Sequence, residues 1–364
     1  MRRKLQKILL FPFALIYGLI IRIRNFLFDA GILREVSFEM PLIGVGNITV
    51  GGTGKTPLIE YLASMLKKDY NIAVLSRGYK RKTRDFNIVS TCSEIKTVGD
   101  EPLQIKQKHN DITVAVDRNR RKGVHEILAR VPETDIILLD DAYQHRYIKA
   151  GLSILLTNYK RLITDDYLLP AGRLREHRAS VKRADIVLVT KSPSVLPAAS
   201  RQHIRNKLPL LPGQHLFFTS LSYDEPMSIF DGPGDEISME MISREFKNVL
   251  LITGIAEPAP LVSFLKQYKP DITHLRFPDH HNYSYHDRKI IAKKYRSMPA
   301  GQRCLITTEK DALRLREKMS PDDFQDNRLF YLRINIIFPD EQSAAFNKLI
   351  SDYVRENRRD NSLS

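Results

Sequence analysis

A glycine-rich loop near the N-terminus constrains the fold more than any other feature of the sequence. The loop Thr49-Val-Gly-Gly-Thr-Gly-Lys-Thr56 follows a short apolar run at Leu42–Val45 and precedes an apolar-periodic stretch at Pro57–Lys68. The run predicts a strand, and the stretch predicts a helix because its apolar residues recur on one helical face. A strand, a glycine-rich loop with Lys-Thr and a helix, in this order, predict a phosphate-binding P-loop. The competing interpretation, a glycine-rich turn that merely contains Lys-Thr, does not explain why these features coincide.

The residue types of this loop suit the phosphates of a nucleotide. Its glycines let backbone N–H groups approach phosphate oxygens without a Cβ in the way, and the following helix adds the partial positive charge of its N-terminus. We expect Lys55 to reach the β- and γ-phosphates and the Thr56 hydroxyl to ligate Mg²⁺. One position departs from the usual pattern, where Thr49 replaces glycine. The residues predicted to bind ATP are Thr49, Val50, Gly51, Gly52, Thr53, Gly54, Lys55 and Thr56.

A second motif supports the first. The apolar run Ile136–Leu139 is followed by Asp140 and Asp141, about 85 residues after the P-loop lysine. In P-loop proteins a buried strand that ends in a carboxylate holds the magnesium ion. We therefore predict Asp140 and Asp141, together with Thr56, as metal ligands. A guanine-specific Asp is replaced by proline in Val189–Pro193, which favours ATP over GTP.

The rest of the chain alternates between short apolar runs and helical stretches. Such runs are typical of parallel strands that are buried on both faces, and their alternation with helices predicts a doubly wound, mostly parallel α/β sheet. Composition shifts towards Pro, Gly, Ser and acidic residues around 213–245, and a second α/β set follows. We expect an N-terminal membrane-associated helix in 1–35, a P-loop core domain in 36–215, a linker in 216–245, a smaller C-terminal α/β lobe in 246–356 and a tail in 357–364. The predicted strands are Ile72–Leu75, Ile112–Val116, Ile136–Leu139, Ser153–Leu156, Ile186–Val189, Val249–Ile252 and Leu305–Thr307.

The N-terminal segment contains an uncharged run from Ile8 to Ile21, with basic residues on both sides. Fourteen residues are fewer than the roughly 20 that a spanning helix needs, and no small-residue cleavage site follows. Phe13, Ile16, Tyr17 and Ile20 share one helical face, and basic residues at both ends can meet lipid phosphates. These features favour a helix lying in a membrane interface. A core helix and a cleaved signal peptide are the alternatives.

The formal net charge of +15 indicates an acidic partner, such as nucleic acid, anionic lipid or a phosphorylated substrate. The sequence carries no aromatic–basic binding signature and no helicase-type motif set, so we expect no nucleic-acid partner. Its two cysteines, Cys92 and Cys304, form neither a C-x-x-C pair nor a metal cluster. We interpret them as reduced cytosolic thiols.

Several stretches resemble one family. Val45–Pro57 is similar to the atypical P-loop of the tetraacyldisaccharide 4′-kinases, including threonine in place of the first glycine. Ala142, where we expect glycine, and Arg173, where we expect proline, depart from the family's pattern. The other similar stretches follow in order along the chain: Ser76–Tyr79, Val98–Pro102, Asp140–Arg146, Leu169–Glu176, Phe277–His280 and Thr307–Asp311.

The resemblance implies a kinase that uses ATP and Mg²⁺. Its acceptor would be the 4′-hydroxyl of a tetraacylated glucosamine disaccharide 1-phosphate, in lipid A assembly at the cytoplasmic face of the inner membrane. We expect this glycolipid and the membrane surface as partners, with no obligatory protein partner. The alternative from another class is a membrane-associated P-loop NTPase that acts as a switch or loading factor.

The same resemblance assigns roles to individual residues. Asp100 matches the candidate catalytic base and His280 its partner, so with Lys55 these form the predicted catalytic set. From the residues alone, a loop aspartate such as Asp100 is usually a cap or turn residue. Asp279–Asn282 also looks like part of a metal cluster, but no further ligand stands at the right spacing.

The basic runs Arg77–Arg84 and Arg118–Lys122 either hold phosphates or form solvated loops. Likewise, His145 and Arg146, beside the metal site, either contact phosphate or are ordinary surface residues. The residues assigned to substrate binding are Tyr79, Glu101, Arg118 and His145.

Overall fold

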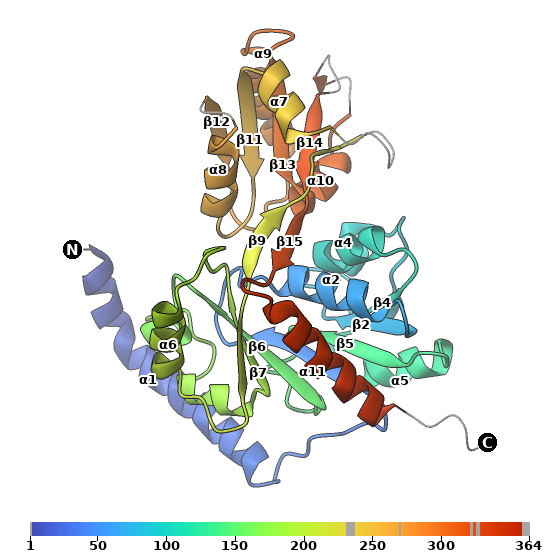
Figure 1. The fold of residues 1–364 in the computed structure, drawn as a ribbon, viewed down its shortest axis with the longest axis vertical. Helices are drawn as coiled ribbons and strands as arrows, with labels where there is room; N and C mark the ends of the chain where they lie inside the picture. Colours follow the sequence, from blue (N-terminus) through green and yellow to red (C-terminus); the bar gives the residue numbers. More distant parts are fainter. Residues whose placement is uncertain (1, 231–236, 269–270, 321–322, 325–327, 359–364) are drawn as a thin grey trace. The chain divides into compact units, whose positions relative to one another are not determined.

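The protein is described by a computed structural model over residues 2–230, 237–268, 271–320, 323–324 and 328–358 (Figure 1). The chain forms two compact units. Unit 1 comprises Met1–Leu221 and Ile336–Ser364, and unit 2 comprises Ser222–Asn335. The second unit is therefore inserted into the chain of the first.

Unit 1 is built on an eight-stranded sheet that is parallel except at one edge, where β3 runs antiparallel to β4. Its central strands are continuous apolar runs with every residue buried, as the sequence predicts. In spatial order the strands are β3 (Asn87–Ile88), β4 (Thr113–Val116), β2 (Ile72–Ser76), β5 (Ile136–Asp140), β1 (Leu42–Asn47), β6 (Leu152–Asn158), β7 (Ile186–Thr190) and β8 (His215–Phe218).

Helices cover both faces of this sheet, because alternate side chains of each strand point to opposite faces. On one face α2 (Lys55–Leu66), α4 (Asp100–Lys108) and α11 (Gln342–Asn357) bury their apolar residues against alternate strand positions. On the other face α5 (Arg120–Arg130) and α6 (Ala198–Lys207) do the same. Shorter elements complete the unit: α3 (Ile95–Val98) and two 3₁₀ turns at Ile163–Asp165 and Arg178–Arg183.

The N-terminal helix α1 (Arg2–Asp29) lies along the outside of unit 1 (Figure 1). Ala14 and Phe28 are buried, and the Tyr17 hydroxyl donates to the Arg175 carbonyl at 2.9 Å. Most other large apolar side chains of α1 are exposed, among them Ile16 and Ile20 at about 60%. Tyr17 therefore faces the protein rather than sharing the exposed face.

The exposure of α1 bears on whether this segment is a core helix or a helix that contacts a membrane. Leu9–Asp29 is long and apolar enough to cross a membrane, a property that core helices and signal sequences share. Only 6% of its most apolar stretch is buried, which does not fit a core helix. The helix also continues past the uncharged run to Asp29, and Arg24 in this extension donates to the Gln144 carbonyl at 2.8 Å.

Unit 2 is a smaller α/β lobe with a five-stranded, mostly parallel sheet. Its apolar core is formed mainly by the sheet and by α9 and α10 on one face, with α7 and α8 on the other. The strands in spatial order are β10 (Met227–Ser228), β14 (Leu329–Leu332), β13 (Arg303–Thr308), β11 (Asn248–Thr253) and β12 (Ile272–Arg276). The helices are α7 (Met239–Glu245), α8 (Ala259–Lys266), α9 (Tyr285–Arg296) and α10 (Glu309–Arg316).

The unit boundaries differ from the predicted domains in two places. The predicted linker 216–245 contains strands β8, β9 (Ser220–Tyr223) and β10 and the helix α7, although its most Gly-rich part, 231–236, lies outside the described residues. The chain then returns to unit 1 through β15 (Ile334–Ile337), which pairs with β9. Helix α11 belongs to unit 1 because Phe346, Ile350 and Val354 are fully buried in its core. Most of the predicted tail 357–364 is also outside the described residues.

Candidate active site

The P-loop connects the end of β1 to the start of α2, at the edge of the sheet where the parallel strands have their carboxyl ends. Gly51 and Gly54 have φ of 111° and 86°, in the left-handed region that favours glycine. Helix α2 begins at Lys55, so the backbone N–H groups of its first turn face the loop. This arrangement agrees with a phosphate cradle.

Neighbouring segments hold the P-loop in place. The Asn47 side chain donates to the Thr53 hydroxyl at 2.6 Å, and the Thr190 hydroxyl donates to the Thr53 carbonyl at 2.8 Å. Val50 N–H donates to the Arg173 carbonyl at 2.8 Å, so the segment around Arg173 packs on the loop from the other side. The cradle is thus fixed from within and from two other parts of unit 1.

The predicted metal ligands lie beside the P-loop because β5 pairs directly with β1, with Val45 opposite Asp140. The Lys55 Nζ atom is 3.4 Å from Asp141 Oδ1, and Arg175 Nη1 is 3.3 Å from Asp141 Oδ2. Burial acts to raise the pKa of Asp141, but the charges of Lys55 and Arg175 outweigh it and lower that pKa. Asp141 is therefore ionised at neutral pH.

Asp140 is buried at the end of β5, with an exposure of 3%. One carboxylate oxygen accepts from the Ser76 hydroxyl at 2.8 Å, and the Asp140 carbonyl accepts from Arg120 at 2.7 Å. Burial, then the negative charges of Glu101 and Asp141, raise the pKa of Asp140 to about 6. A buried carboxylate among other negative charges is a common arrangement for a cation site.

These residues fit Mg²⁺. Among the described residues, the Asp140 Oδ1 atom is buried and accepts no hydrogen bond. Within the same part of the chain, including Asp279–Asn282, no group of three or more His, Cys, Asp and Glu side chains is arranged to hold a metal ion. Mg²⁺ commonly takes only one or two carboxylates and completes its shell with substrate phosphates and water. Asp140, Asp141 and the Thr56 hydroxyl suit that mode.

Asp100 is the first residue of α4 and is buried, with an exposure of 4%. Its Oδ1 accepts from the Glu101 N–H at 2.9 Å. The preceding Gly99 has a φ of 93° and approaches Gly78 so closely that a Cβ would lie 3.2 Å from the Gly78 Cα. The loop after β2, which carries Tyr79, therefore packs against the turn that positions Asp100. Tyr79 itself is 55% exposed.

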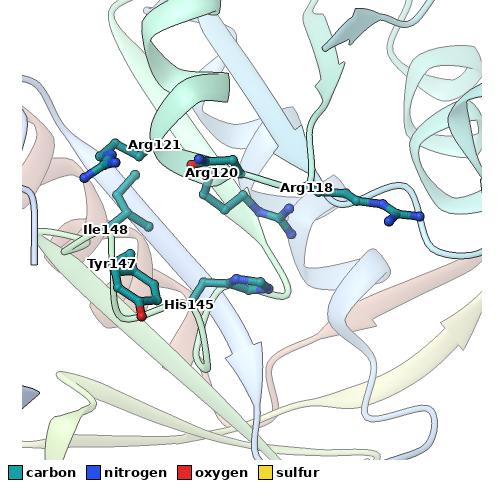
Figure 2. A pocket seen from close by; sticks show the side chains of 7 residues that line it. Arg118, Arg120, Arg121, His145, Tyr147 and Ile148 are labelled. Atoms are coloured by element: carbon teal, nitrogen blue, oxygen red, sulfur yellow. The ribbon is translucent and has the colours of Figure 1, made fainter. Parts of the chain in front are cut away.

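A basic pocket of about 370 Å³ lies between the N-terminus of α5 and the loop after β5. Figure 2 shows the Arg120 guanidinium directed towards His145, whereas Arg118 and Arg121 extend in opposite directions. Burial, then the charges of Arg120 and Arg77, lower the pKa of His145 to about 4. His145 is therefore neutral at pH 7 and is available to donate or accept a hydrogen bond. Tyr147 and Ile148 add an apolar wall.

His280 belongs to unit 2, whereas Asp100 belongs to unit 1, so their pairing stays a prediction. The His280 residue has a φ of 55° and lies after β12, near the start of α10 in the same unit. The neighbouring His281 donates from Nε2 to the Asp287 carboxylate at 2.9 Å, at the N-terminus of α9. His281 is thus part of a helix cap.

The chain was compared with known proteins. The family model described as tetraacyldisaccharide-1-P 4′-kinase matches residues 6–355. A tetraacyldisaccharide 4′-kinase of Flavobacterium johnsoniae is 47% identical over 97% of this chain and 98% of its own length. The corresponding protein of Phocaeicola vulgatus is 44% identical over 98% of this chain and 97% of its own.

The chain belongs to the tetraacyldisaccharide 4′-kinase family. The family and the enzyme class predicted from the motifs are thereby confirmed. A crystal structure of an "apo" form of LpxK from Aquifex aeolicus in complex with ATP has a TM-score of 0.72 and 28% identity. It covers 97% of this chain and 100% of its own, which confirms the predicted α/β fold.

In this member of the 4′-kinase family, several side chains that support the site were not predicted. Ser76 and Arg120 contact Asp140, and Gln144 donates to the carbonyl of Asn47 in β1 at 2.5 Å. Arg175 contacts Asp141. Each of these residues follows a predicted strand or lies in a stretch that resembles the family. This position in the sequence is the feature from which a role in the site could have been predicted.

Proposed function

We propose that this protein transfers the γ-phosphoryl group of ATP to the 4′-hydroxyl of a tetraacylated glucosamine disaccharide 1-phosphate. One observation carries the proposal. At the ends of adjacent strands, the P-loop Lys55 lies 3.4 Å from Asp141 and next to the buried Asp140, in a chain of the 4′-kinase family. Phosphoryl transfer depends mainly on positioning and charge stabilisation, and this cluster supplies both.

The P-loop side of the site would hold ATP. Backbone N–H groups of Thr49–Thr56 would surround the phosphates, and the Lys55 ammonium would move from Asp141 to the β- and γ-phosphate oxygens. Asp140, Asp141 and Thr56 would hold Mg²⁺. When bound, Mg²⁺ neutralises the charge that develops on the phosphate oxygens.

Asp100 would receive the proton of the acceptor. As the 4′-oxygen bonds to the γ-phosphorus, its proton passes to the Asp100 carboxylate, and the bond from that phosphorus to the bridging oxygen breaks to release ADP. A carboxylate has an ordinary pKa near 4 and is a weak base by itself. We therefore assign His280 as the partner that stabilises Asp100 during this step.

The basic pocket would bind the anionic end of the acceptor. Arg118 on its rim and the buried Arg120 give it positive charge, and neutral His145 adds a hydrogen-bonding group. Arginine suits phosphate because its planar guanidinium donates two parallel hydrogen bonds. We assign Tyr79 and Glu101, which lie near Asp100 and Asp140, to the sugar hydroxyls.

The acceptor's acyl chains would remain in the bilayer, and α1 would bring the enzyme to them. From Leu9 onwards, the outer face of this helix carries exposed apolar side chains. Each methylene group that they bury in lipid would contribute about 0.8 kcal/mol to membrane binding. Because ATP is a cytoplasmic substrate, we place the enzyme at the cytoplasmic face of the inner membrane. The net charge of +15 suits an anionic leaflet, and the proposal requires no protein partner.

The test is an incubation with Mg-ATP, with and without the acylated disaccharide 1-phosphate in mixed micelles. We expect a lipid product that carries one more phosphate and ADP formation that depends on the acceptor. A switch or loading factor would instead hydrolyse ATP without the lipid and would leave the lipid unchanged. The Lys67→Ala variant is a matched control for Lys55→Ala, since Lys67 lies at the other end of α2 and pairs with Asp111.

A further inference from the structure

The His280 ring lies between two cations of helix α10. Its Nδ1 atom is 3.3 Å from Arg314 Nη2, and its Nε2 atom is 3.3 Å from Lys310 Nζ. The Asp279 carboxylate is further away, at 4.0 Å from Nε2. The backbone of His280 is fixed as well, because its N–H donates to the Gly254 carbonyl at 3.1 Å. Both ends of the imidazole therefore have a defined neighbour.

Of the two cations, Arg314 is firmly held. It is only 6% exposed, and its Nη1 atom donates to the Gly254 carbonyl at 3.3 Å and to Asp311 Oδ1 at 3.1 Å. Asp311 is completely buried and also accepts from the Gly254 N–H at 2.8 Å, the Thr308 hydroxyl at 2.8 Å and the Tyr283 hydroxyl at 3.1 Å. The guanidinium thus rests on a carboxylate that is itself fixed by three other donors.

The chemistry of these groups determines the tautomer of the ring. A guanidinium and an ammonium both have donors and no acceptor, so each would bind a ring nitrogen that offers its lone pair, and a neutral imidazole has only one such nitrogen. Arg314 is buried and held by Gly254 and Asp311, whereas the Lys310 ammonium is carried on a flexible stem and can turn away, so Nδ1 offers its lone pair to Arg314. A neutral imidazole carries a single ring hydrogen, which then resides on Nε2. We propose that Arg314 is a positioning residue that fixes His280 as the Nε2–H tautomer.

In this tautomer the Nε2 atom of His280 can donate a hydrogen bond. Once the Lys310 ammonium turns away from Nε2, the Nε2–H group and the ammonium can both donate to one anionic oxygen. In the proposed function this oxygen would belong to the Asp100 carboxylate or to a phosphate of ATP. The inference rests on the proposed role of His280. The inference also excludes one role for His280. An Nε2 atom that already carries a hydrogen cannot take the proton of the acceptor hydroxyl, so that proton goes to Asp100.

Kinetics of variants test whether Arg314 acts through His280. We expect Arg314→Met to lower kcat by about 10- to 100-fold, the usual range for residues that orient a functional histidine, with little change in the KM for ATP. Arg314→Lys should restore part of the activity, because lysine can also donate to Nδ1. In Arg314→Met combined with His280→Ala, the loss should equal that of His280→Ala alone. Losses that multiply would overturn the proposal.

The matched control is Arg316→Met on the same helix. Arg316 is exposed and donates to the backbone carbonyls of Ser228 and Ile229, away from His280. Its substitution should leave kcat within about twofold, since the control alters the helix but not the ring. A loss as large as that of Arg314→Met would indicate a general effect on unit 2 and would overturn the assignment.

The tautomer itself is read from ¹⁵N-histidine spectra of the full chain in micelles, with the His280 signals identified by their loss in His280→Ala. We expect a protonated Nε2 and an unprotonated Nδ1, and a mixture of tautomers in Arg314→Met. A protonated Nδ1 in the wild-type protein would overturn the proposal. Normal turnover of His280→Ala, with the expected spectrum, would instead refute only the catalytic role of His280.

The same spectra identify the anionic oxygen. If Asp100 supplies it, the Nε2 resonance should shift in Asp100→Asn without nucleotide. If ATP supplies it, the resonance should shift when a non-hydrolysable Mg-ATP analogue is added and should be unchanged in Asp100→Asn. No shift in either experiment would overturn the role of the Nε2–H group as a donor to an anion.

Discussion

Lys55 and Thr56 are the two P-loop side chains whose loss should affect phosphate and metal separately. Lys55→Ala removes the charge that stabilises the γ-phosphate in the transition state, so we expect kcat to fall by about 10²- to 10³-fold. Thr56→Ala removes the proposed metal ligand and should raise the Mg²⁺ concentration needed for half-maximal activity. Initial rates over a Mg²⁺ titration measure both effects, with Lys67→Ala as the control. Near-normal turnover of both variants would contradict the P-loop assignment.

Asp100 and His280 are expected to act as one unit. Asp100→Ala and His280→Ala should each lower kcat strongly and change the KM for ATP little, and the double variant should be little worse than the worse single one. His281→Ala is the control. Its ring bonds to Asp287 at the N-terminus of α9, so its loss should lower the stability of unit 2 more than kcat. A larger kinetic effect at His281 than at His280 would show that His281, and not His280, acts with Asp100.

His145 should make stability depend on pH. Its pKa is lowered to about 4 in the folded protein, against an ordinary value near 6.5. Between these values the unfolded chain binds a proton that the folded chain does not, so stability falls as pH decreases from 6.5 towards 4. The slope from this group is at most about 1.4 kcal/mol per pH unit, and less because the ring is partly accessible to solvent.

The measurement is urea unfolding at pH 7 and pH 5, for the wild-type protein and for His145→Gln. Glutamine cannot titrate, so the variant should lose less stability between the two pH values than the wild-type protein loses. His203→Gln is a suitable control, because His203 is exposed on α6. An equal pH dependence in the wild-type protein and His145→Gln would contradict the expected linkage.

Sequence patterns predicted those parts of the site that depend on neighbours in the chain. The P-loop and the Asp140–Asp141 pair could be recognised because each follows a strand within one local motif. Arg120 and Arg175 could not be assigned in this way. Their contacts with Asp140 and Asp141 depend on which strands lie next to each other and on the packing of a distant loop on the P-loop.

At the scale of elements, α1 has one face on the protein and another exposed. The pair Ile16→Ser and Ile20→Ser alters only exposed side chains, each about 60% accessible. We expect this double variant to bind vesicles of anionic phospholipid less, to show a higher KM for the acceptor and to keep its melting temperature. Burial of a full isoleucine side chain contributes about 1.5–3 kcal/mol, so the loss should be large.

Deletion of residues 1–24 should also move the protein from the membrane to the soluble fraction. It additionally removes Tyr17, which donates to Arg175, and Gly18, which packs closely on Leu168, so the deletion also perturbs the core. Val195→Ser is the control for the point variants, because Val195 is 80% exposed elsewhere in unit 1. Unchanged vesicle binding in the Ile16 and Ile20 variant would contradict the membrane role of α1.

The central strands that were predicted share one property, burial on both faces. A fully buried parallel strand has a continuous apolar run, which is visible in a single sequence. Two-residue strands such as β3 have no such run. The uncharged run Ile8–Ile21 is shorter than α1, because Arg22 and Arg24 interrupt the apolar pattern but not the helix, and Arg24 donates to the Gln144 carbonyl.

At the scale of the whole molecule, the chain returns from unit 2 to unit 1 and adds helix α11 to its core. We expect this helix to stabilise unit 1. Phe346 on α11 is fully buried and contacts the rings of Phe217 and Phe338 at centroid distances of 5.4 and 4.7 Å. We expect Phe346→Ala to lower the free energy of unfolding of unit 1 by about 3–5 kcal/mol. Lys348→Ala, at an exposed position of the same helix, should change it by less than about 0.5 kcal/mol.

Hydrogen exchange measured by mass spectrometry separates the two units in this experiment. Peptides from β1, β5 and β6 should lose protection in Phe346→Ala, whereas peptides from β11 and β13 should keep it. Equal loss in both units would mean that α11 supports the whole chain rather than unit 1. The sequence alone could not show that the predicted C-terminal lobe 246–356 ends before α11. The amphipathic pattern of α11 would be the same whether the helix packed on unit 1 or on unit 2.

The insertion of unit 2 also determines the order in which the protein can be completed during synthesis. The Tyr353 hydroxyl bonds to both the N–H and the carbonyl of Leu42, at 3.2 Å each, across 311 residues of chain. Domains generally fold as units while the ribosome elongates the chain. A nascent chain that ends before Ile336 contains all of unit 2 but lacks α11. The first strand therefore gains this contact only after α11 has been synthesised, and until then the part of the sheet that α11 covers stays exposed on the nascent chain.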